Sequence, residues 1–205
     1  MPYVVDVGPK KEYKKRLSYK KIKLIHLACE HIPFEIGGSL DFDKKGRFVR
    51  IQVFPPGKRD ELTLHDNLIL EWHSHPDESH VAFPSVTDLM AQAKRSINSN
   101  SQNPKKYKKF RGPLAIVFSR WGAVTYSYNR CTIPTKKDQK AMLDFIMRIA
   151  RSTLSDTYPS MKLMAEFIRT YGFRICLQSW AEIKKKGLRL EWASRRFHNK
   201  PSKKK

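Results

Sequence analysis

Two histidines separated by one residue give the clearest chemical signal in the chain. His73 and His75 end an apolar stretch, residues 67–75, whose composition predicts a β-strand. Side chains two apart on a strand point to the same face, about 6.5–7 Å from each other, so two imidazoles can converge on one metal ion. The spacing therefore indicates a pair of metal ligands, although the same pattern also occurs on strands that bind no metal.

A carboxylate that completes such a pair stands at the start of the next predicted helix. Ser85 and Asp88 open a helix that is expected to run to about Ile97, and Asp88 is its third residue if Ser85 is the N-cap. Two imidazoles and one carboxylate leave the fourth position of a tetrahedral zinc ion open for water, which is the layout of a catalytic site. Ser-x-x-Asp is equally a variant of the capping box, so the same residues can serve only to start the helix.

The elements around these residues predict an α+β fold with a mixed β-sheet and a C-terminal helical extension. A helix over 18–32 ends before Pro33, and two pairs of strand-like segments form hairpins. Those pairs are 34–42 with 47–54, and 113–118 with 123–128. Helical patterns follow from Lys137 and after Pro159, and an amphipathic basic region covers 180–197. The predicted units are a basic arm (1–17), a core domain (18–135), a helical extension (136–197) and a basic tail (198–205).

The charge of the chain is large and unevenly distributed. The 205 residues include 41 Lys and Arg against 19 Asp and Glu, a net charge of +22, and 40% apolar residues, enough for one sizeable core. Residues 1–23, 105–111 and 184–205 carry 20 of the 22 net charges. Such clusters favour either a polyanionic partner or simply solvated segments.

Several protein classes do not fit the sequence. No apolar run approaches the roughly 20 residues that a membrane-spanning helix needs, so we expect neither a transmembrane protein nor a membrane partner. The N-terminus lacks the apolar region of a secretory signal. Cys29, Cys131 and Cys176 are odd in number and far apart, which predicts neither a disulfide framework nor a zinc ribbon. We therefore expect a reducing intracellular compartment such as the cytoplasm, with association with a virion as an alternative.

Three segments taken together resemble one known family. Glu35-Ile-Gly-Gly-Ser-Leu40, Glu71-Trp-His-Ser-His-Pro76 and Pro84-Ser-Val-Thr-Asp88 are similar, in order and in element type, to the signature of the JAMM (JAB1/MPN/Mov34, MPN+) zinc metalloproteases. The segment around the two histidines, residues 71–76, is most similar to the corresponding segment of the prokaryotic-type JAB members. The resemblance covers about residues 18–135 and implies a JAB/MPN-like domain.

The resemblance also implies a role for each matching residue. His73, His75 and Asp88 would bind one Zn²⁺ ion, Glu35 would orient and deprotonate the attacking water, and Ser85 would hydrogen-bond the developing oxyanion. The implied activity is that of an isopeptidase or peptidase that cuts at the C-terminus of ubiquitin or a ubiquitin-like protein, in deconjugation or precursor trimming. The implied partner is therefore a ubiquitin-like protein or its conjugates.

Some features depart from the family pattern. The nine residues between His75 and Ser85 make this loop two residues longer than is usual in the family. Glu71 is expected on the same strand face as the two histidines, which makes it a rival carboxylate to Glu35. His80, in the longer loop, is a substitute ligand, a substrate contact or a solvated histidine.

The basic segments leave a second class of function open. By the resemblance, residues 98–111 correspond to an insertion that, in eukaryotic deubiquitinases of the family, shapes a ubiquitin site and can bind a second zinc ion. They contain neither Cys nor His, so we expect no second structural zinc. Their Lys105, Lys106, Lys108 and Lys109 could contact an acidic substrate surface or a phosphate backbone, or could be a solvated loop. The competing function is a JAB-fold scaffold that binds nucleic acid or a large assembly such as a virion, with a vestigial or structural metal site. A JAMM-fold protein that acts near DNA is a third reading. The sequence predicts no oligomeric state.

Overall fold

The described part of the chain contains five helices and eight strands. The structure, a computed structural model, describes residues 13–42, 47–54, 70–75, 83–102, 113–130, 132–151 and 158–192. The helices are α1 (Tyr19–His31), α2 (Val86–Gln102), α3 (Lys136–Ala150), α4 (Tyr158–Arg169) and α5 (Trp180–Lys186). The strands are β1 (Tyr13–Leu17), β2 (Gly37–Phe42), β3 (Phe48–Val53), β4 (Leu70–Ser74), β5 (Leu114–Phe118), β6 (Gly122–Tyr128), β7 (Phe173–Ser179) and β8 (Leu188–Trp192).

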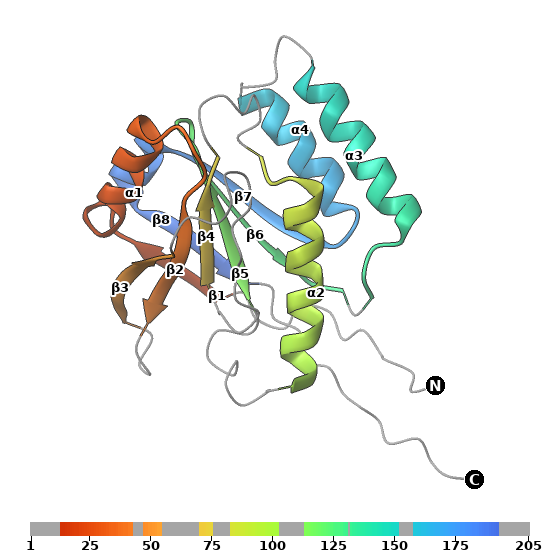
Figure 1. Cartoon of the computed structure of the whole chain (residues 1–205), viewed down its shortest axis with the longest axis horizontal. Helices are drawn as coiled ribbons and strands as arrows, with labels where there is room; N and C mark the ends of the chain where they lie inside the picture. Colours follow the sequence, from red (N-terminus) through yellow and green to blue (C-terminus); the bar gives the residue numbers. More distant parts are fainter. Residues whose placement is uncertain are drawn as a thin grey trace.

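Six of the strands form one mixed sheet in the order β3-β2-β4-β5-β6-β7 (Figure 1). β4 and β5 pair in parallel, and the other four neighbouring pairs are antiparallel. β1 and β8 form a separate antiparallel ribbon. The predicted α+β class and mixed sheet are confirmed, as are the two predicted hairpins, which are β2–β3 and β5–β6.

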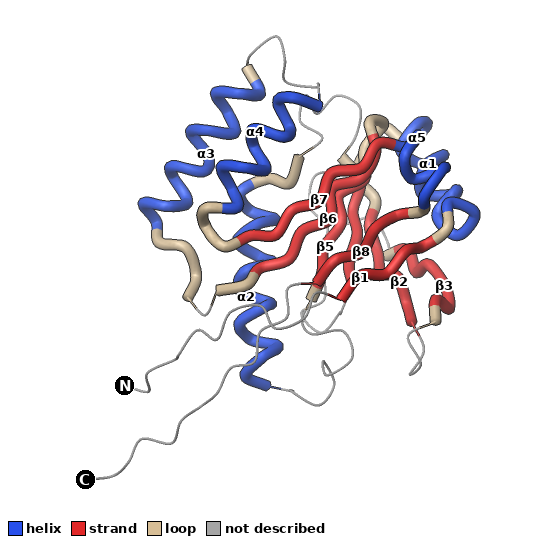
Figure 2. Tube along the Cα trace, turned by 180° about the vertical axis from the view of Figure 1, so that it is seen from behind, coloured by secondary structure: helices blue, strands red, loops and turns tan. Residues whose placement is uncertain are grey.

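The sheet separates two hydrophobic cores. α2, α3 and α4 cover one face, where Leu89, Met142 and Met164 pack against Val117 and Val124. α1, α5 and the β1–β8 ribbon cover the other face, where the core is built around Trp72 and Trp180 (Figure 2). Alternate residues of a strand therefore enter different cores. On β4, Leu70 and Trp72 face α1, whereas Glu71 and His73 face α2.

The C-terminal third differs from the prediction. Residues 136–150 and 158–169 are helical as expected, but 173–179 and 188–192 are strands, so the prediction of a helical extension over 136–197 is wrong for these two segments. β7 is the edge of the main sheet, which therefore extends across the predicted boundary at residue 135.

The predicted basic arm, residues 1–17, also takes part in the fold. Its described end is β1, which pairs with β8 along its whole length and brings the two ends of the described chain together. Leu17, at the end of β1, is buried in the core around Trp72. No helix among the described residues is both long enough and apolar enough to cross a membrane.

Candidate metal centre

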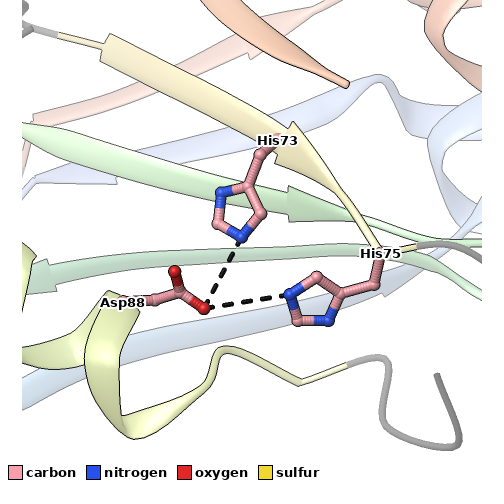
Figure 3. Close-up of side chains that lie close together, drawn as sticks. All are labelled: His73, His75 and Asp88. Atoms are coloured by element: carbon pink, nitrogen blue, oxygen red, sulfur yellow. Dashed lines mark ion pairs between the residues drawn. The ribbon is translucent and has the colours of Figure 1, made fainter. Parts of the chain in front are cut away.

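His73, His75 and Asp88 converge where the end of β4 meets the start of α2 (Figure 3). The Nε2 atom of His73 lies 3.5 Å from Oδ2 of Asp88, and the Nε2 atom of His75 lies 3.8 Å from the same oxygen. One ligand atom from each of the three residues lies within 4.8 Å of the other two. The two histidine side chains are 6% and 9% exposed and the aspartate side chain 20%, so the group is largely shielded from water.

The separations fit a metal ion better than direct hydrogen bonds. Nitrogen-to-oxygen hydrogen bonds are usually about 2.7–3.2 Å long, shorter than both distances. Ligand atoms around a tetrahedral zinc ion, with bonds of about 2.1 Å, lie about 3.4 Å from each other. Two imidazoles and one carboxylate are also a donor set that zinc accepts. This buried group could therefore hold a metal ion.

The sheet fixes the positions of the two histidines. β4 lies between β2 and β5, and the backbone N–H of His75 donates to the carbonyl of Phe118 at 2.8 Å, which continues the pairing one residue beyond β4. The His73 and His75 rings lie 5.2 Å apart between centroids. A strand paired on both sides has little freedom to change its register, so both imidazoles are held toward α2.

The start of α2 fixes the aspartate. The N–H and Oγ of Ser85 both donate to Oδ2 of Asp88, at 2.8 and 2.7 Å, and the N–H of Asp88 donates back to the Ser85 Oγ at 3.1 Å. These bonds form a capping box, so Ser85 and Asp88 do start the helix. The same bonds aim the carboxylate at the histidines, which means that the helix-start and ligand readings are compatible.

The carboxylate of Asp88 is held in its ionised form. Burial alone would raise the pKa of Asp88, but the two nearby histidine rings, the hydrogen bonds from Ser85 and the charge of His73 more than offset burial and hold the pKa well below its usual range. An ionised carboxylate is the form that binds a cation.

Glu35 lies beside this group, as the family resemblance implies. Its Oε1 atom is 4.0 Å from Nε2 of His75, and its side chain is 30% exposed, so water can reach it. Glu35 belongs to the segment between α1 and β2, and Ser74 attaches this segment to β4. The Oγ of Ser74 accepts from the Ile36 N–H at 3.1 Å and donates to the Ile36 carbonyl at 3.3 Å, while the Ser74 N–H donates to that carbonyl at 2.7 Å.

The rival carboxylate, Glu71, points to a different partner. It is 1% exposed and forms an ion pair with Arg95, two turns beyond Asp88 on α2. It is not part of the group of potential metal ligands found among the described residues. Glu71 and Arg95 therefore connect the strand that carries the histidines to the helix that carries the aspartate.

Two residues near the site, Arg95 and Ser74, were not singled out from the sequence. Arg95 is buried on α2 against Glu71, a contact that no local pattern in the sequence reports. His80 and the four lysines of the basic loop, Lys105, Lys106, Lys108 and Lys109, lie outside the described residues.

Comparison with models of known protein families gives no match for this chain, and a comparison with curated proteins finds no relative. The residues of the site and their geometry therefore carry the functional argument.

Proposed function

We propose that this protein is a zinc-dependent isopeptidase or peptidase with a JAB/MPN-like core, and that it cuts at the C-terminus of ubiquitin or a ubiquitin-like protein. The observation that carries the proposal is the convergence of two imidazoles and one carboxylate at 3.5 and 3.8 Å, with a second carboxylate 4.0 Å from one imidazole. Three ligands together with a nearby water-accessible carboxylate are what metal-assisted hydrolysis of an amide requires.

Each residue has a distinct task in this proposal. His73, His75 and Asp88 hold the metal, and zinc when bound supplies a Lewis acid that polarises a carbonyl and makes water more acidic. Glu35 takes a proton from the attacking water and delivers it to the leaving amine. The Ser85 hydroxyl turns from Asp88 to the oxyanion that develops on the scissile carbonyl. No covalent intermediate with the protein is needed.

The substrate class rests on the resemblance to the JAMM family. The order of the elements supports this resemblance, because Glu35 precedes β2, His73 and His75 lie at the end of β4 and just beyond it, and Ser85 and Asp88 start α2. The alternative of a basic scaffold rests on the charge of the chain. Nothing in binding alone requires two buried imidazoles to face one ionised carboxylate, so the site favours the enzyme.

The test compares Glu35→Gln with a matched control, Glu166→Gln, which changes an exposed glutamate on α4. Both variants and the wild type are incubated with a panel of ubiquitin-like proteins that carry a C-terminal amide-linked fluorophore or a lysine-linked peptide, and bound zinc is measured in parallel. We expect Glu35→Gln to keep its zinc and to lose at least about 100-fold in cleavage rate, because a neutral amide cannot take the proton from the attacking water. Glu166→Gln should cleave like the wild type.

Two results would contradict the proposal. Equal cleavage by Glu35→Gln and the wild type would remove Glu35 as the base. Absence of cleavage by the zinc-loaded wild type across the panel, with nucleic-acid binding that weakens steeply with salt, would favour the scaffold.

A further inference from the structure

A groove runs along the outer edge of β7, away from the metal centre. It has a volume of about 600 Å³ and is lined by β7 together with residues of α4 and β8. β7 is the last strand of the six-stranded sheet, and no strand among the described residues pairs with its outer edge. None of the lining residues belongs to the metal centre.

The register shows which backbone groups of β7 face the groove. In an antiparallel pair, alternate residues direct both of their backbone groups toward the partner strand. Gly172 accepts from the Asn129 N–H, and Trp180 donates to the Trp121 carbonyl, so the even-numbered residues of β7 bond to β6. The odd-numbered residues Phe173, Ile175 and Leu177 therefore direct their N–H and C=O groups outward.

A side-chain contact supports this assignment. Arg169, on α4, donates to the Ile175 carbonyl at 2.8 Å, as expected for a group on the outer edge. The outward groups at 173 and 177 flank this contact. An edge strand with groups spaced in this way is a template for an added strand, in which main-chain hydrogen bonds supply affinity.

The walls of the groove are basic. Lys162 and Arg169 stand on the α4 side, and Arg174 and Arg189 stand on the β8 side. The one acidic residue in the lining, Glu191, is 7% exposed and pairs with both Arg174 and Arg189. The lining therefore carries a net charge of +3, on both sides of the strand.

We propose that this groove binds an extended acidic segment of a partner protein, which adds to the sheet as a seventh strand beside β7. Successive side chains of an added strand point to opposite faces, so its acidic residues meet the α4 side and the β8 side in turn. Charge complementarity selects the acidic partner, and the backbone of β7 selects an extended peptide over nucleic acid. A phosphate backbone lacks the alternating donors and acceptors that an edge strand pairs with.

The first test uses the wild-type protein and two probes. One is a short fluorescent peptide in which two Glu alternate with two Thr, so that glutamates point to both faces of the added strand. The other has the same sequence but is N-methylated throughout its central residues. Both have the same charge, but only the first can pair as a strand. We expect N-methylation to weaken binding at least about tenfold, because several backbone hydrogen bonds are lost. Equal binding of both probes would show that charge alone holds them and would overturn the proposal.

Amide hydrogen exchange locates the bound peptide. The peptide should slow exchange at the outward amides of Phe173, Ile175 and Leu177, while the amides of Arg174 and Cys176, which face β6, should change little. Protection elsewhere without protection at the three outward amides would place the peptide on another surface and contradict the proposal. Protection of these amides by a single-stranded oligonucleotide, and not by the peptide, would assign the groove to nucleic acid.

A pair of charge reversals provides the matched variants. Lys162→Glu reverses an exposed charge in the groove, and Lys140→Glu makes the same change on the exposed surface of α3. We expect Lys162→Glu to weaken binding of the unmethylated peptide about fivefold and Lys140→Glu to have little effect. An equal effect of the two variants would mean that the overall charge of the chain, not the groove, binds the peptide.

Discussion

The ion pair between Glu71 and Arg95 gives a prediction with a magnitude. The two residues are 1% and 6% exposed, and they connect β4 to α2 inside the core. Arg95→Met removes one partner and leaves a buried carboxylate whose principal cation is gone. Breaking a buried pair in this way costs about 3–5 kcal/mol of unfolding free energy. For a chain of this length, that loss corresponds to a fall in Tm of roughly 10 °C.

The double variant Glu71→Met/Arg95→Met separates the charge from the space it fills. Each methionine is apolar and fills part of the space of the side chain that it replaces, so no buried charge remains at this pair. We therefore expect an unfolding free energy within about 2 kcal/mol of the wild-type value. Urea unfolding of the single and double variants measures both values. Because Glu71 is a connecting residue and not a ligand in our account, the double variant should also bind as much zinc as the wild type.

Either of two results would refute this reasoning. A loss below about 1 kcal/mol in Arg95→Met would mean that the pair is not the buried connection we describe. A folded double variant that no longer binds zinc would make Glu71 part of the metal centre.

Two further predictions concern Ser74 and His26. Ser74→Ala removes the two hydroxyl bonds to Ile36 but keeps the backbone bond, so it should loosen the segment that carries Glu35. We expect the cleavage rate to fall about tenfold with bound zinc unchanged, and Ser74→Thr to restore most of the rate. Loss of zinc in Ser74→Ala would contradict this. Burial lowers the pKa of His26, whose ring is hydrogen-bonded to the Tyr19 hydroxyl at 2.8 Å and packs against Trp180. The unfolded chain therefore takes up the proton first, and stability falls as the pH drops below about 6.5. His26→Gln should flatten this part of the stability curve in urea titrations between about pH 5 and 8, and an unchanged slope would exclude His26 as its cause.

The ligand residues could be predicted because their signals are local. The period of two along a strand places His73 and His75 on one face, and Ser85 and Asp88 start a helix through contacts three residues apart. The contact between β4 and the start of α2 is part of the tertiary structure, and only the family resemblance implied it. The position of Glu35 depends on bonds between Ser74 and Ile36, which are 38 residues apart, and no local pattern reports them.

The C-terminal strands were missed for a different reason. Phe173, Ile175 and Leu177 alternate with more polar residues, which is a strand pattern, and Leu188 and Leu190 repeat it. Both strands are short and stand on either side of α5, a helix of seven residues. A single amphipathic interpretation of 180–197 therefore covered α5 and β8 together, and β7 lay just before it within the predicted helical extension. The partner of β8 is β1, at the other end of the chain, and its contribution cannot be read from nearby residues.

The most direct test of the metal centre is the metal content of the purified protein by elemental analysis. The wild type is compared with His73→Ala/His75→Ala and with a control, His31→Ala, which changes an exposed histidine at the end of α1. We predict about one zinc ion per chain in the wild type and in the control, and none in the double variant. A folded wild type that holds no zinc after zinc is added back, or a double variant that holds as much as the wild type, would contradict the account.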